Sequence, residues 1–201
     1  MFRSLISSAT ILAAAATGGF KNTTTINPDT VDELDLASYT GYWYQMAADA
    51  VVYNTFEKDA YCATAFYGDN SDGTISVHNY ATIGAPDGTV YTIDGYAYGS
   101  NPEEPGQLLV HFDAEEAAPF DAPYWVLALG PLNSAKQYDW AIVSDNVSYF
   151  LFVLARDVET YNTQYKAEVD QLLVDLGFTG RKAPIYTYHG DDCVYESTVT
   201  K

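Results

Sequence analysis

Positive charge is scarce in this sequence. Only 9 residues are lysine or arginine, against 27 aspartates and glutamates, and the formal net charge is −18 at pH 7. Such a surface repels polyanions, so the charge balance excludes nucleic acid as a partner. The few basic residues form no cluster, and anionic lipid headgroups are disfavoured for the same reason. Any affinity for lipid is therefore expected inside the fold.

Long apolar runs are missing too, with one exception near the start. Arg3 is followed by an apolar stretch over residues 5–16 that is too short to span a bilayer and ends in small alanines. This pattern predicts a secretory signal peptide over about residues 1–18, an exposed arm over 19–32 and one domain over 33–201. An organelle transit peptide, leading to an organelle lumen, is the alternative, but it would carry more arginine. No other segment predicts stable membrane insertion.

Cysteine is nearly absent, and the two that occur, Cys62 and Cys193, lie far apart in the chain. In an oxidising compartment an even pair is usually a disulfide, which predicts a bridge between them. A metal site is not expected, because neither cysteine has a second cysteine or a histidine at ligand spacing. Two sequons, at Asn22 and Asn146, predict N-glycosylation of a secreted chain.

Short runs rich in tyrosine, phenylalanine, valine, isoleucine and threonine follow one another through the middle of the chain. Clusters of glycine, proline, asparagine and aspartate separate them, which is typical of strands joined by hairpins. The order predicts an up-and-down antiparallel sheet. The eight expected strands cover residues 41–47, 61–67, 74–81, 89–98, 107–112, 124–129, 138–144 and 149–156.

After the strands the period becomes helical, and Gly177 lies where a helix C-cap glycine belongs. Eight antiparallel strands and one amphipathic helix predict an all-β fold, a closed barrel with the helix packed on its outside, because closure removes exposed edges. The interior of an eight-stranded barrel is just able to hold one small ligand. One apolar stripe defines the helix over about 160–176, formed by Tyr165, Val169, Leu172, Leu173 and Leu176.

Three separated motifs resemble those of the lipocalin family. The first is Gly41-Tyr42-Trp43-Tyr44, the second spans residues 138–143 (YDWAIV), and the third spans 154–156 (LAR). Among lipocalins the chain is most similar to the subgroup of apolipoprotein D and the bacterial and plant stress lipocalins. The resemblance implies structural roles for Gly41, Trp43 and Arg156: Trp43 would plug the closed end of the barrel, and Arg156 would lie across its ring.

Side chains alternate across a strand, so an inward Trp43 places Gln45 inward as well. The same alternation, together with the alignment to lipocalins, predicts the lining of the other strands and turns Cys62 outward, where Cys193 could reach it. Alanine and glycine on neighbouring strands leave volume, which favours a ligand over a filled core. The predicted ligand-binding residues are Gln45, Ala63, Ala65, Tyr67, Ile75, Val77, Asn79, Ile93, Gly95, Ala97, Val110, Phe112, Tyr124, Val126, Ala128, Val143, Phe150, Phe152 and Leu154.

No catalytic residue is expected. Cys62 is predicted to face outward and be oxidised, and the histidines His78, His111 and His189 fall on outward positions or in the tail without an obvious catalytic partner. No cofactor is expected either.

The sequence therefore predicts a secreted carrier that reversibly binds a small hydrophobic molecule, such as a fatty acid, retinoid, carotenoid or sterol-like lipid. An enzyme acting on a lipid or pigment in the same cavity is one alternative, which an inward acid or thiol would favour. A secreted interaction protein with a filled barrel is the other. The oligomeric state is not predicted.

Overall fold

The computed structural model describes residues 27–114 and 120–196. The predicted signal peptide, most of the polar arm and the sequon at Asn22 therefore lie outside the described residues. Within the described part of the chain, no helix has the length and apolar character needed to cross a membrane.

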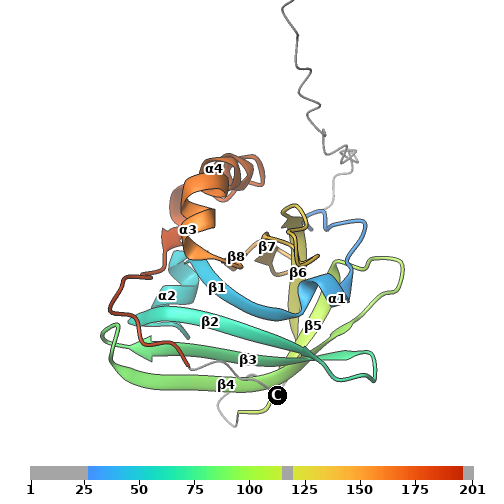
Figure 1. Cartoon of the computed structure of the whole chain (residues 1–201). Coiled ribbons are helices and arrows are strands. Elements are labelled where there is room, and N and C mark those ends of the chain that lie inside the picture. The colour runs from blue at the N-terminus through green and yellow to red at the C-terminus, as the bar shows by residue number, and fades with distance from the viewer. Residues whose placement is uncertain (1–26, 115–119, 197–201) are drawn as a thin grey trace, which may run out of the picture.

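Eight antiparallel strands form a closed barrel, as the sequence predicts (Figure 1). Consecutive strands pair with one another, and β8 and β2 both pair with β1, which closes the sheet. The strands are β1 Gly41–Ala48, β2 Ala60–Asp69, β3 Thr74–Ile83, β4 Thr89–Gly99, β5 Gln107–Phe112, β6 Ala122–Leu129, β7 Trp140–Ser144 and β8 Leu151–Ala155.

Two strands begin later than predicted, each for a local reason. Before β7, Tyr138 forms only an isolated bridge with Leu132. Before β8, the carboxylate of Asp145 accepts hydrogen bonds from the backbone N–H groups of Val147 and Tyr149, which holds this segment as a turn. The structure also adds a two-residue strand, β9 Ile185–Tyr186, on β1. This strand is too short to leave a period in the sequence.

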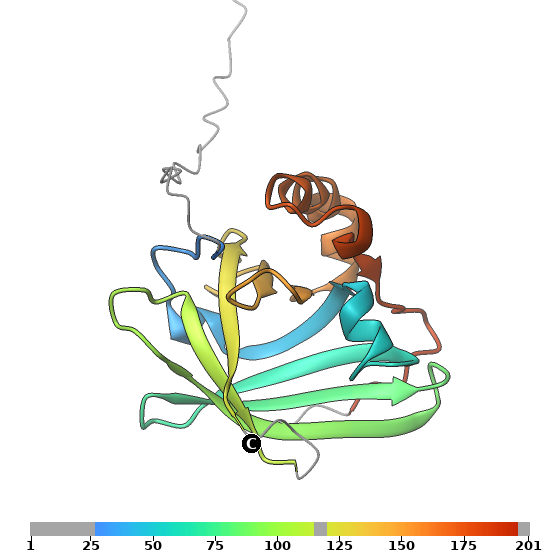
Figure 2. The same ribbon diagram turned by 180° about the vertical axis from the view of Figure 1, so that it is seen from behind.

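Two short helices lie at opposite ends of the barrel (Figures 1 and 2). Helix α1 (Leu36–Tyr39) precedes β1, and α2 (Ala50–Asn54) follows it. Each is capped by an aspartate: Asp35 accepts from the N–H of Ala37, and Asp49 from those of Val51 and Val52.

The predicted C-terminal helix is present, with one interruption. It consists of α3 (Val158–Thr160), a π-helical turn over Tyr161–Tyr165, and α4 (Lys166–Asp175). Gly177 then takes a positive φ of 87°, as the predicted C-cap requires. Figure 1 shows α4 lying on the outside of the barrel.

Two apolar clusters lie on the two faces of the barrel wall. The outer cluster joins the wall to the apolar stripe of the helix. Its buried members are Met46, Ala47, Leu127, Trp140, Ile142, Leu151, Val153, Ala155, Tyr161, Val169, Leu173 and Phe178. The inner cluster lines the interior: Tyr39, Trp43, Ala65, Tyr67, Ile75, Val77, Ala97, Val110, Val126, Ala141, Val143 and Leu154.

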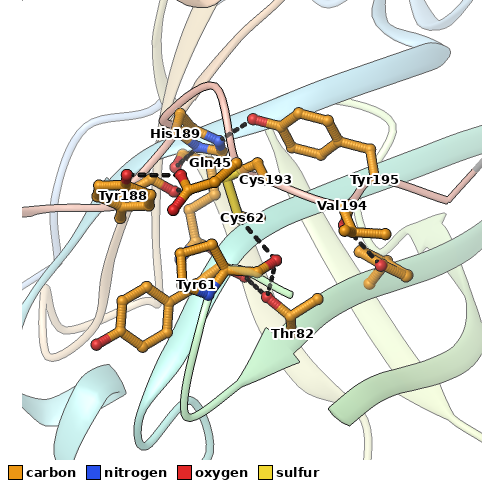
Figure 3. Close-up of a disulfide and its surroundings, with 12 residues drawn as sticks. Gln45, Tyr61, Cys62, Thr82, Tyr188, His189, Cys193, Val194 and Tyr195 are labelled. Atoms are coloured by element: carbon orange, nitrogen blue, oxygen red, sulfur yellow. Dashed lines mark hydrogen bonds between the residues drawn. A yellow bond between two sulfur atoms is a disulfide. The ribbon is translucent and has the colours of Figure 1, made fainter. Parts of the chain in front are cut away.

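The chain after the helix runs over the outside of β2 and β3 and is fixed there by the predicted disulfide between Cys62 and Cys193 (Figure 3). The backbone N–H of Cys62 donates to the carbonyl of Tyr188, 3.0 Å away, and the Tyr80 hydroxyl donates to the carbonyl of Val194, 2.8 Å away. Cys62 lies at a register shift between β2 and β3 and has a positive φ of 54°. This bulge re-aims the cysteine toward the tail.

Candidate functional site

The end of the barrel beside α1 is closed by Trp43 and Arg156. The Trp43 side chain is fully buried, and its indole N–H donates to the Tyr39 carbonyl, 2.9 Å away. The guanidinium carbon of Arg156 lies 3.5 Å from the centre of the indole ring, in the predicted cation–π contact. Burial lowers the pKa of Arg156 to about 10. Its N–H groups reach five backbone carbonyls, those of Ser38, Tyr39, Thr40, Tyr42 and Tyr138.

Gly41 gives this closed end its shape. It has a φ of 101°, which residues other than glycine rarely adopt. A Cβ atom there would lie 2.8 Å from the Gln137 amide nitrogen and 3.2 Å from Nη1 of Arg156. The glycine of the first motif therefore makes room for the arginine of the third.

Most of the predicted lining faces the interior. Three residues, Phe112, Tyr124 and Phe152, are partly buried and pack against the inner cluster. The nine that belong to the cluster itself are Ala65, Tyr67, Ile75, Val77, Ala97, Val110, Val126, Val143 and Leu154.

The strand register places further predicted residues inward. Gln45 pairs with Leu154, and Asn79 pairs with both Ala65 and Ile93, so the three positions share the inner face. Gln45 is buried, whereas Asn79 and Ile93 are partly exposed.

Phe150 and Ala63 lie in less regular places. Phe150 precedes β8, and its ring contacts that of Phe56 with the centres 5.5 Å apart. Ala63 is buried in the bulge beside Cys62 and is not a member of the inner cluster.

One predicted lining position, Ala128, lies on the other face of the wall, and a second, Gly95, has a role beyond the predicted one. The β6–β7 register shifts between Val126 and Ala128, so Ala128 pairs with Ile142 and packs against the outer cluster. A bulge of this kind reverses the side-chain alternation that the prediction assumed. Gly95 does not simply leave volume for a ligand, because a Cβ there would lie 2.0 Å from the His111 carbonyl oxygen. The glycine allows β4 and β5 to approach closely.

The inner-face residues of β2 to β5 differ slightly in exposure from the outer-face residues at the contact with the helix. The inner-cluster side chains of β2 to β5 keep 4–7% of their surface accessible, although they point into the barrel. In the outer cluster, Ile142 and Val153 on the strands and Val169 on α4 keep none, whereas Leu127 keeps 8%. These residues line the lumen, the interior of the barrel, and their small accessible surface is what a ligand there would cover.

Three tyrosine hydroxyls form a polar chain in this otherwise apolar lumen. The hydroxyl of Tyr124 lies 2.7 Å from that of Tyr39 and 3.2 Å from that of Tyr67. Burial raises the pKa of all three phenols, that of Tyr67 to about 12, so they stay neutral. Three hydroxyls that share two hydrogen bonds leave one O–H donor free for another acceptor.

The other end of the lumen, its mouth, carries an acid that the sequence analysis did not identify. Glu57, in the loop after α2, accepts a hydrogen bond at Oε2 from the amide nitrogen of the inward Gln45, 2.5 Å away. Burial raises the pKa of this carboxyl to about 7. Glu57 stands beside Lys58 and Asp59 in the chain, a combination that resembles a solvated turn, and no periodicity marks it.

The histidines lie outside the lumen, but they have more partners than the sequence indicated. His78 lies between Asp94 and Glu196, at 2.6 and 2.7 Å. Nδ1 of His111 lies 2.8 Å from a carboxylate oxygen of Asp121. These acids come from a neighbouring strand, a loop and the tail, which sequence spacing cannot bring together. Among the described residues no group of three or more His, Cys, Asp or Glu side chains is arranged so that it could hold a metal ion.

A closed eight-stranded barrel with a plugged base, an apolar lumen and one helix on its outer wall defines the class of up-and-down barrels that enclose a small molecule. The family comparison agrees with this class. Residues 34–182 match the model of the lipocalin-like domain, and the chain belongs to the lipocalin family.

Curated relatives and solved structures extend this result. The chain is 39% identical over 112 residues to apolipoprotein D of Cavia porcellus, a match over 56% of this chain and 54% of the relative. It thus spans about half the length of that protein. The fold is similar to insecticyanin from the tobacco hornworm Manduca sexta, with a TM-score of 0.64 at 18% identity over 84% of this chain and 88% of that one. Japanin from Rhipicephalus appendiculatus, solved bound to cholesterol, has a TM-score of 0.55 at 13% identity over 80% of this chain and 100% of that one.

Proposed function

We propose that this protein is a carrier that reversibly holds one small hydrophobic molecule in the lumen of its barrel. The observation that carries the proposal is the accessible surface left on inward side chains of β2 to β5. Natural cores are packed to crystal-like density, so apolar space inside a barrel is typical of a binding cavity. Fatty acids, retinoids, carotenoids and sterol-like lipids are the candidate ligands. Japanin, which shares the fold, has cholesterol as its bound molecule, so a barrel of this architecture can take a ligand of sterol size.

The enzyme alternative has to be weighed against Glu57, because an inward acid was the feature that would favour it. General acid–base chemistry needs a second group positioned to exchange the proton. Among the described residues, Glu57 hydrogen-bonds the Gln45 amide, which has no proton to exchange at neutral pH. Cys62 is oxidised, so it provides no thiolate nucleophile. The carrier hypothesis accounts for these groups better.

Secretion belongs to the same proposal. The disulfide between Cys62 and Cys193 favours an oxidising compartment. Asn146 lies partly exposed in the turn before β8, so the sequon there is accessible for an attached glycan. We propose that the leader is removed and that the mature chain acts outside the cell.

Native mass spectrometry, followed by organic extraction, tests the carrier hypothesis on protein from a secretory expression host. The expected result is one lipid or pigment molecule per chain. The variant Ala65→Leu should lose this ligand because it fills the lumen, and Thr92→Leu, at an exposed position on β4, should keep it. A chain that is empty and that binds no member of a panel of fatty acids, retinoids, carotenoids and sterols would instead support the interaction protein with a filled barrel.

A further inference from the structure

We propose that the molecule held in the lumen carries a protonated amine, and that the carboxylate of Glu57 at the mouth pairs with it. This inference rests on the carrier function proposed above and narrows it to cationic amphiphiles, molecules with an apolar body and one ammonium group. It stands on four observations: the position of Glu57, its missing counter-ion, the aromatic rings that contact the neighbouring Phe56, and the hydrogen bonds that occupy Arg156.

The carboxylate is held toward the lumen by the fold of its loop. The backbone N–H of Glu57 donates to the carbonyl of Val52 in α2, 3.1 Å away, which turns the chain back over the end of the barrel. The side chain then reaches Gln45, which lies on the inner face of β1 opposite Leu154. Glu57 is partly buried, so part of its surface remains accessible.

No cation of the protein neutralises this acid in the described part of the chain. The ion pairs found there involve only His78, His111 and Lys166. Arg156, the arginine on the lumen side of the wall, is at the closed end, and its N–H groups are occupied by five backbone carbonyls. A partly buried carboxylate with one amide donor and no cation is unfavourable unless something else compensates its charge.

The other acids near the mouth have structural roles that Glu57 does not have. Asp49 caps α2, and Asp145 holds the turn before β8 through two backbone N–H groups. Glu57 caps no helix and holds no turn with its side chain; its carboxylate accepts only from Gln45. An ionised carboxylate has about four acceptor sites, so most of its capacity is available to a ligand.

The surroundings suit an ammonium group with an apolar body. Phe56 precedes Glu57, and its ring centre lies 5.5 Å from that of Phe150 and 6.3 Å from that of Phe152. Aromatic faces attract cations as well as apolar groups. A fatty-acid anion would meet the opposite situation, with an acid at the mouth, a net charge of −18 and an Arg156 whose N–H groups already bond backbone carbonyls. Among ligands that share one apolar skeleton, we therefore expect the amine to bind most tightly, the alcohol less tightly and the carboxylate most weakly.

The titratable groups around Glu57 leave it as the group that responds near neutral pH. Tyr53 on α2 and Tyr67 on β2 are phenols whose pKa burial raises to about 12, and both stay neutral. His189 bonds the backbone carbonyl of Gln45, and burial lowers its pKa, so it is already neutral at pH 7. Since the Glu57 pKa is about 7, the acceptor becomes ionised as the pH rises through neutrality.

The test compares matched ligands by titration calorimetry: dodecylamine, dodecanol and dodecanoate, with naphthylethylamine, naphthylethanol and naphthylacetate as a second skeleton. We expect each amine to bind at least about tenfold more tightly than its alcohol, with the carboxylate weakest. Between about pH 6 and pH 8, amine affinity should rise up to about tenfold as Glu57 ionises, and alcohol affinity should not.

Two variants locate the effect. Glu57→Gln keeps the size and removes the charge, and it should abolish both the amine preference and its pH dependence while alcohol affinity stays within about twofold. Glu104→Gln, the same charge change at an exposed loop position, should leave both intact. Alcohols that bind as tightly as amines, or equal losses in the two variants, would overturn the inference but leave the carrier function standing. Failure of all six ligands and of the neutral lipids would contradict the carrier function itself.

Discussion

The inner and outer clusters lie on the two faces of one barrel wall, yet they are packed differently. On the outer face the chain supplies its own cover: Val169 and Leu173 from α4 lie on the strands, and both keep at most 1% of their surface exposed. On the inner face, Ala65, Ile75 and Val77 point into the lumen and keep 4–7% of their surface exposed. The difference separates two tasks. We expect stability to depend most on the outer face, and the proposed binding to depend on the inner face.

Removal of the disulfide should have the largest effect on stability and little effect on binding. Changing both Cys62 and Cys193 to alanine opens a loop of 131 residues, and the chain-entropy model puts the loss at about 4 to 5 kcal/mol. The bond lies outside the barrel, so affinity for a neutral apolar dye should stay within about twofold. Urea denaturation and dye titration measure the two quantities. A large loss of affinity at an unchanged fold would show that the faces are coupled.

Truncation within the outer cluster comes next. Leu173→Ala removes a side chain that is 1% exposed beneath the helix, and we expect a loss of about 3 kcal/mol in the free energy of unfolding. Leu172→Ala, one position away on the partly buried edge of the same stripe, is the matched control and should cost clearly less. Equal losses of stability at the two positions would mean that the helix does not cover the outer face as described above.

Glu57, the acid at the mouth, should differ from the residues above, because its replacement is expected to stabilise the protein. Burial raises the pKa of Glu57 from 4.5 to about 7, so the folded protein binds more protons than the unfolded chain between these values. The contribution of Glu57 to stability is thus fully present below about pH 4.5 and is lost as the pH rises through about 7. Glu57→Gln should therefore stabilise the empty protein at about pH 8 by about 2 kcal/mol, and by much less at about pH 5. A stability difference that does not change with pH would contradict this account.

Two matched substitutions of alanine by leucine should have the smallest effects on stability, and they compare the two faces of the wall most directly. Ala47→Leu enlarges a side chain in the sealed outer cluster and should cost about 1 to 2 kcal/mol. Ala65→Leu makes the same change toward the lumen, where space is available, and should cost less than about 0.5 kcal/mol while it weakens dye binding. If Ala65→Leu is as destabilising as Ala47→Leu, the lumen is a packed core.

Regular elements were predictable from the sequence, and local irregularities were not. The strand alternation placed Ala65, Val77 and Leu154 correctly, and the helical stripe led to the outer cluster. Ala128 was assigned to the wrong face because a bulge inserts one residue into β6, which leaves no trace in an alternating apolar pattern. Glu57 was missed because its environment arises when a loop folds back over the mouth, and no spacing in the sequence records that approach.

The bridge between Cys62 and Cys193 also sets an order of events during synthesis. The partner cysteine is made 131 residues after the first, which at ordinary rates of translation corresponds to roughly 7 to 26 seconds. Until then the thiol of Cys62 has no cysteine with which to form its disulfide. A chain that stops short of the tail keeps that thiol, so a free sulfhydryl chemically marks an unfinished molecule.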